Sequence, residues 1–166
     1  MKPHILIFLF SIFFLYSCDI ATQPSHVLSA PEYLPVKKIV DGDTFWADDG
    51  SSKGIKVRLI GIDAPESRKS FKKEIGVYGK ESKAYLSQLL QGKKVRLVYD
   101  VDLKDQYGRT LAYVYLEDGT FVNADLIKNG YAIILTVPPN IKFADHFYKL
   151  QQKARESKKG LWNVSP

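Results

Sequence analysis

The chain has 166 residues, 45% of them hydrophobic, and its 24 Lys and Arg residues outnumber its 18 Asp and Glu residues, which gives a formal net charge of +6. This length fits one globular domain, and the single cysteine, Cys18, excludes a fold held together by internal disulfides. The basic balance favours polyanionic partners without specifying one, because many basic domains bind no nucleic acid.

The first 17 residues have the pattern of a secretory signal. Lys2 is followed by a nearly unbroken apolar run over residues 5–16, which is too short for a comfortable membrane span. A small residue before Cys18 resembles a bacterial lipoprotein signal, in which the cysteine becomes the lipidated first residue. We therefore predict that residues 1–17 are removed and that Cys18 anchors an exported protein to a membrane of the cell envelope. The alternatives are an ordinary cleaved signal, with free secretion, and an uncleaved N-terminal anchor.

Residues 18–34 separate this signal from the patterned part of the chain. They contain two prolines and several small polar residues with no hydrophobic period. We predict a flexible tether over residues 18–34 and one globular domain over residues 35–163.

The globular part begins with short β segments, and helices follow later in the chain. Apolar alternation and turn residues predict two strands within residues 36–50, one over 54–62, and one each within 93–100 and 109–119. Helical periodicity and glycine stops predict helices within residues 80–92, 120–130 and 141–160. Residues 64–79 are basic and unperiodic, as in a long surface loop. A mainly β chain of this size predicts a small five-stranded barrel with helices, and the OB-fold is the barrel of this size that binds oligonucleotides.

Asp41 and Asp43 flank a glycine in the first predicted strand pair. If the segment is a strand, residues two apart lie on the same side, and both carboxylates point together. The alternative is a turn, because Asp-Gly is a frequent hairpin signal. From this segment alone the turn is favoured.

Four acidic residues come at the ends of adjacent predicted strands: Asp41, Asp43, Asp63 and Glu66. Carboxylates about 4 Å apart repel by a few kcal/mol at intermediate dielectric, so a cluster needs a cation or a proton. An all-oxygen set suits calcium or magnesium. Only His26 and His146 follow the signal, neither near these carboxylates in sequence, which argues against zinc.

Arg58 begins the third strand, and Arg109 enters the fifth. A guanidinium can bind two phosphate oxygens at once, so two arginines, one metal ion and one carboxylate suffice for phosphodiester hydrolysis. The alternative for each arginine is a structural ion pair. Positions 58 and 63 lie on opposite faces of a regular strand, so the site requires a break at Gly61 or before Pro65.

Three motifs, "VDGDTF", "VRLIGIDAPE" and "DQYGRTLAYVY", occur in the order and approximate spacing of the staphylococcal nuclease family. The resemblance runs from about residue 36 to residue 162. It implies an OB-fold barrel of five strands with three helices. It also implies calcium-dependent cleavage of DNA and RNA that leaves 3′-phosphate ends, and we expect a monomer.

The resemblance also implies a metal site. The calcium ligands of the family fall on Asp43, Asp63 and the backbone carbonyl of Ala64. Asp41 matches an aspartate that supports the metal through water.

The same resemblance implies the catalytic groups. Glu66 matches the proposed general base, and Arg58 and Arg109 match the two phosphate-binding arginines. Tyr107 matches a tyrosine near the substrate phosphate.

Two departures from the family pattern concern substrate binding. Gln106 stands where a lysine helps to hold a phosphate, and Thr136 or its neighbours stand where a tyrosine packs near the bound base. Tyr131 is a possible replacement, although core packing is the favoured role. Three loop lysines offer further attraction for a phosphate backbone, with a solvated loop as the alternative: Lys69, Lys72 and Lys73.

The alternative function is a non-catalytic nucleic-acid-binding OB-fold or an envelope lipoprotein that binds a protein partner. A degenerate domain of that kind should lose one or more of the reactive side chains. The chain keeps five of them, which favours the enzyme: Asp43, Arg58, Asp63, Glu66 and Arg109.

Overall fold

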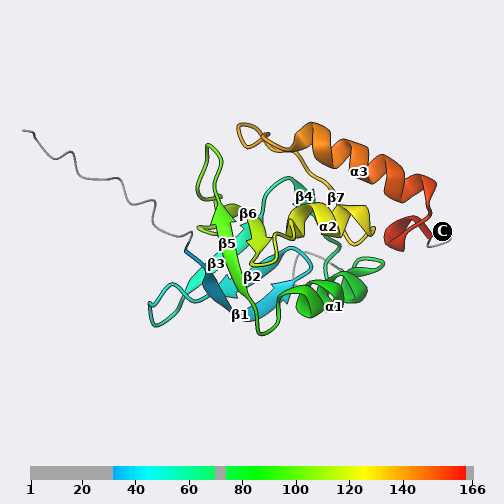
Figure 1. The fold of residues 1–166 in the computed structure, drawn as a ribbon. Coiled ribbons are helices and arrows are strands. Elements are labelled where there is room, and N and C mark those ends of the chain that lie inside the picture. The colour runs from blue at the N-terminus through cyan, green and yellow to red at the C-terminus, as the bar shows by residue number, and fades with distance from the viewer. Residues whose placement is uncertain (1–31, 70–73, 164–166) are drawn as a thin grey trace, which may run out of the picture.

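The computed structural model describes residues 32–69 and 74–163. The predicted signal, Cys18 and most of the tether lie outside the described residues. Five strands close a barrel in the order β1-β2-β3-β6-β5, and the three α-helices of the described part of the chain lie to one side of it in the view of Figure 1. The predicted fold class is therefore confirmed.

The barrel strands are β1 (Leu34–Asp41), β2 (Thr44–Ala47), β3 (Ile55–Leu59), β5 (Lys94–Val98) and β6 (Thr110–Leu116). The helices are α1 (Gly79–Leu90), α2 (Val122–Lys128) and α3 (Ala144–Glu156), followed by the 3-10 turn η1 (Gly160–Asn163). Two short strands, β4 (Ile62–Asp63) and β7 (Ile133–Ile134), pair outside the barrel. Strand β1 begins at Leu34, which is the last residue of the predicted tether over residues 18–34.

Alternate residues of the strands fill the barrel, as the pleat requires. Phe45, Val57 and Val114 are fully buried. Helices α1 and α2 add apolar side chains to the same core, and α3 adds Phe147. No helix among the described residues is long and apolar enough to cross a membrane.

The predicted strand over residues 54–62 is interrupted at Gly61, which lies between β3 and β4. Gly61 has φ +78°, a backbone conformation that favours glycine. A β-carbon there would lie 2.7 Å from the ring of Phe147 in α3. The chain turns at this point, and β4 leaves the barrel to pair with β7. The break that brings positions 58 and 63 to the same place is thus present.

A buried amide fixes this turn to the barrel. Asn123 of α2 donates to the carbonyl of Ile60 at 2.9 Å and accepts from the amide of Val114 at 2.9 Å. Because buried polar groups are costly when unpaired, these bonds hold the turn and β6 together.

The segment around Gly42 is a hairpin turn rather than a continuous strand. Asp41 of β1 pairs with Thr44 of β2, so Gly42 and Asp43 form a two-residue connection. The strand interpretation is wrong here, and the turn is correct. A β-carbon on Gly42 would lie 2.7 Å from the β-carbon of Ala64, so only glycine allows this close approach.

Gly61→Ala should lower the free energy of unfolding more than Gly119→Ala does. Both positions have positive φ, but Gly119 has open space around its α-carbon. The control should lose about 1–2 kcal/mol from backbone strain, and Gly61→Ala should lose about 1–3 kcal/mol more from overlap with Phe147. Urea denaturation measures both, and equal losses would show that the Phe147 contact does not constrain the turn.

Candidate active site

The turn after β1, the strands β3 and β4 and the entry to β6 surround one polar pocket of about 380 Å³. Its lining includes seven of the eight residues predicted for the site: Asp41, Asp43, Arg58, Asp63, Ala64, Glu66 and Arg109. The eighth, Tyr107, lines the neighbouring pocket. The structure thus brings the predicted residues to one place.

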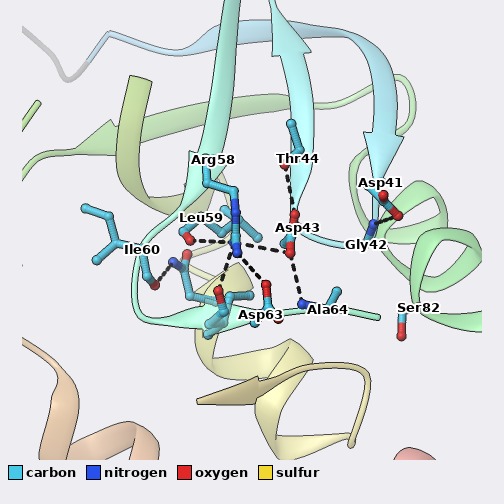
Figure 2. A network of polar contacts seen from close by, with 12 residues as sticks. Asp41, Gly42, Asp43, Thr44, Arg58, Leu59, Ile60, Asp63, Ala64 and Ser82 are labelled. Carbon is cyan, nitrogen blue, oxygen red and sulfur yellow. Dashed lines mark hydrogen bonds and ion pairs between the residues drawn. The ribbon is translucent and has the colours of Figure 1, made fainter. Parts of the chain in front are cut away.

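Arg58 lies at the centre of this site (Figure 2). Its Nη2 atom donates to Asp63 Oδ1 at 2.8 Å, and its Nη1 atom lies 3.2 Å from Asp43 Oδ2. Nη1 also donates to the carbonyls of Leu59 at 3.0 Å and Ile62 at 2.8 Å. The guanidinium therefore joins the hairpin turn, the end of β3 and β4 through one buried group.

Asp43 is the more buried of the two carboxylates that contact Arg58, with a side chain 9% exposed against 44% for Asp63. Its Oδ2 accepts from the backbone amide of Ala64 at 2.9 Å, and its Oδ1 accepts from the hydroxyl of Thr44 at 2.8 Å. A charge this far from water needs such partners.

Asp41 holds the segment after β4 against the hairpin. Asp41 Oδ1 accepts from the amides of Gly42 at 2.9 Å and Ser67 at 3.1 Å. The carbonyl of Glu66 accepts from the amide of Gly76 at 3.0 Å, and Glu66 is one of the residues that line the pocket. Asp41 therefore fixes the backbone beside Glu66.

Arg109 is positioned by Asp105, which the sequence analysis did not single out. Arg109 Nε donates to Asp105 Oδ2 at 2.6 Å, and Asp105 Oδ1 accepts from the amides of Tyr107 and Arg109. The guanidinium also lies over the Tyr107 ring, 5.4 Å from its centroid. The turn pattern Asp-x-x-Gly at residues 105–108 is the feature of the sequence that indicates this role of Asp105.

The environment of Asp105 lowers the pKa of its carboxyl group. Burial acts to raise that pKa, but hydrogen bonds from Arg109 and Tyr107 and the charge of Arg109 outweigh it. Asp105 is therefore held as an anion that fixes the direction of the Arg109 side chain.

A second pocket of about 300 Å³ adjoins the first, and the two share Arg58, Arg109 and Leu135. Gln106 and Tyr107 line it, and the Tyr107 side chain is largely exposed. The stretch around Thr136 contributes aliphatic Leu135 and Val137, so no aromatic ring comes from that side. This aliphatic wall agrees with the prediction that the chain lacks a tyrosine to pack near the bound base.

The remaining sequence predictions about substrate binding concern Tyr131 and the three loop lysines. Tyr131 stacks on Tyr85 with ring centroids 3.9 Å apart, which agrees with core packing. Lys69 forms an exposed ion pair with Glu74 at 2.8 Å. Lys72 and Lys73 lie outside the described residues.

Lys56 and Arg68 also line the polar pocket, although the sequence analysis assigned them no role. Lys56 is two residues before Arg58 on β3, so strand alternation was a signal for it. Arg68 directly follows the acidic motif, in the stretch predicted to be a surface loop.

The oxygen donors of the site suit a hard divalent ion. The described residues contain no group of three or more Asp, Glu, His or Cys side chains placed to hold a metal. An ion here would therefore rest on Asp43, Asp63 and backbone or water oxygens. Asp43 has three of its roughly four acceptor positions engaged by Thr44, Ala64 and Arg58, which leaves capacity for a cation. The residues present fit such an ion.

Comparison with known proteins agrees with the geometry. Residues 56–164 match the family model described as "Staphylococcal nuclease homologue". The thermonuclease of Staphylococcus intermedius is 41% identical over 128 residues, which cover 76% of this chain and 74% of the relative. That of Staphylococcus hyicus is 40% identical over 129 residues, covering 77% and 74%. An uncharacterized endonuclease of Escherichia coli is 34% identical over 140 residues, covering 82% and 81%.

Asp105→Asn should lower the free energy of unfolding at neutral pH, on the order of 1 kcal/mol, because the paired anion is lost. A lowered folded-state pKa gives stability that is present above the unfolded pKa of about 3.9 and disappears as the pH falls through the folded value. Urea denaturation of both proteins across pH should show the difference shrinking below about pH 4. A difference that stays constant with pH would contradict the ionic role.

Proposed function

Because the chain belongs to the staphylococcal nuclease family, and is by that membership a hydrolytic nuclease, we propose that it cleaves DNA and RNA in a calcium-dependent reaction that leaves 3′-phosphate ends. The observation that carries this proposal is the convergence of two arginines and three carboxylates on one pocket: Arg58, Arg109, Asp43, Asp63 and Glu66. Arg58, Asp63 and Glu66 come from one stretch of nine residues, whereas Asp43 and Arg109 come from other parts of the sequence. Phosphodiester hydrolysis requires these groups together.

The two arginines bind the phosphate in this proposal. They lie where the two pockets meet, so a phosphate there has the polar pocket on one side and the apolar wall on the other. Their N–H groups donate to the phosphoryl oxygens and stabilise the charge that grows on them in the transition state. Asp105 keeps Arg109 aimed, and Tyr107 borders the same phosphate.

Glu66 is the proposed general base. It accepts a proton from a water molecule whose oxygen attacks phosphorus, while the bond from phosphorus to the 5′ oxygen breaks. The proton then passes to the departing 5′ oxygen, and the other product keeps a 3′-phosphate. The support for this role is that Glu66 lines the same pocket as Arg58 and Arg109.

Asp43, Asp63 and the Ala64 carbonyl would hold the calcium ion, with Asp41 in support. A bound divalent ion would supply charge neutralisation for the phosphoryl oxygens. Glu66 keeps its role as base in this assignment. A non-catalytic module is disfavoured, because it has no need to keep all the reactive side chains in one pocket.

We also propose that the protein is exported, that residues 1–17 are removed and that Cys18 carries the lipid anchor. The support is the apolar run and the residues next to Cys18. Metabolic labelling with palmitate should mark the wild-type protein and not Cys18→Ala. Label in both proteins would overturn the anchor assignment.

Digestion of polynucleotides tests the proposed activity. The protein should cleave single-stranded DNA, duplex DNA and RNA with calcium, and a chelator should abolish cleavage. Detection of 3′-phosphate ends tests the product. Uncut substrate in calcium would reject the function, and cleavage in chelator would reject the metal dependence.

Arg109→Ala should lower the cleavage rate by about 10³–10⁵, as loss of an arginine does in phosphoryl transfer. Arg96→Ala is the matched control, because Arg96 of β5 lies over the ring of Tyr115 of β6 and lines neither pocket of the site. Initial rates on single-stranded DNA measure both. If the two variants lose the same activity, Arg109 does not act on the substrate.

Glu66→Gln should lower the turnover number by at least about 10² while leaving calcium-dependent nucleotide binding largely intact, because it removes proton transfer and keeps the shape. Rates on single-stranded DNA and calorimetric titration with a nucleotide separate the two effects. A loss of affinity equal to the loss of rate would contradict the base role.

A further inference from the structure

We propose that Lys56 and Arg68 form a second phosphate subsite, which binds the phosphate next to the one held between Arg58 and Arg109. This inference rests on the proposed function, because it concerns how a polynucleotide extends from the reacting phosphate. Both side chains line the polar pocket, and neither is needed for the chemistry assigned above.

The charges of the pocket distinguish these two residues from the other cations. Its lining contains four acidic and four basic side chains. Arg58 is paired with Asp43 and Asp63, and Arg109 is paired with Asp105. Within residues 32–69 and 74–163, no ion pair involves the other two basic residues of the lining, Lys56 and Arg68. Their charge is therefore available to an anion from solution.

The position of Lys56 on β3 sets its distance from the reacting phosphate. Val57 and Leu59 point into the barrel core, so Lys56 and Arg58 share the opposite face of the strand. The α-carbons of residues two apart on a strand are separated by roughly 6.6 Å. That separation is comparable with the distance between neighbouring phosphates of an extended nucleic acid strand. Lys56 is thus one phosphate step away from Arg58.

Arg68 is brought to the same pocket by the anchor of the preceding residue. The amide of Ser67 donates to Asp41 Oδ1 at 3.1 Å, and Ser67 is buried. The backbone before Arg68 is therefore fixed, while the Arg68 side chain is exposed toward solvent. An arginine and a lysine facing one cavity can share a phosphate, since the guanidinium binds two of its oxygens.

The subsite gives the pocket a polarity along the bound strand. Val137 lines only the second pocket, Lys56 and Arg68 line only the polar pocket, and Arg58 and Arg109 line both. A polynucleotide would occupy both sides of the reacting phosphate. A mononucleotide has one phosphate and would fill only the site between the two arginines.

Binding of two probes tests the inference in the Glu66→Gln background with calcium, where cleavage is suppressed. The probes are a nucleoside monophosphate and a single-stranded DNA of about 12 nucleotides, within the range of OB-fold site sizes. Lys56→Ala with Arg68→Ala should weaken DNA binding about tenfold and reduce the slope of log K against log salt by about 0.7, the value for one phosphate contact. Affinity for the monophosphate should not change.

The double variant Lys94→Ala with Arg96→Ala is the matched control, because it also removes one lysine and one arginine. Both residues lie on β5, which lines neither pocket of the site. The control should change DNA affinity less than twofold and leave the slope unchanged. Equal effects of the two double variants on DNA would overturn the subsite, and so would an equal loss of both probes in the Lys56 and Arg68 variant. Failure of the proposed function is distinguishable, because the wild-type protein would then leave DNA uncut in calcium.

Discussion

The site depends on one buried guanidinium. Arg58 contacts two carboxylates and two backbone carbonyls that come from the hairpin turn and both sides of the turn at Gly61. Without it, Asp43 would be a largely buried anion whose cationic partner is missing, which is among the more costly defects in a protein interior. In the proposed function, the same group also binds the phosphate and lies beside the two carboxylates that would hold the metal ion. The proposal therefore makes stability and function depend on the same group.

Close contacts in the surrounding fold keep this group in position. Gly42 lets the hairpin turn approach Ala64, Gly61 redirects the chain after β3, and Asn123 ties that redirected turn to β6. Asp41 then holds the backbone of Ser67, so the segment with the proposed base is attached to the same hairpin. Each of these contacts fixes the position of a backbone segment. Together they bring side chains from separate parts of the sequence into one pocket.

Much of this could be predicted from the sequence. The alternation of short strands gave the barrel, and the motifs around Asp43, Arg58 and Arg109 identified residues that the structure brings together. The break near Gly61 followed from the conflict between positions 58 and 63. The carboxylate of Asp105 was missed because its role depends on a local turn that closes on Arg109. The presence of Lys56 and Arg68 in the pocket depends on tertiary packing, which leaves only weak signals along the chain.

A double-mutant cycle between Arg58 and Asp43 measures the central interaction most directly. The free energy of unfolding would be determined in urea, with chelator, for Arg58→Met, Asp43→Asn and the double variant. Arg58→Met should cost about 3–5 kcal/mol, because it leaves Asp43 buried without a cationic partner. Asp43→Asn should cost less, because Arg58 keeps its ion pair with Asp63. The double variant should lose at least about 1 kcal/mol less than the two losses combined. Losses that simply add would contradict the account, since Arg58 and Asp43 would then stabilise the protein independently.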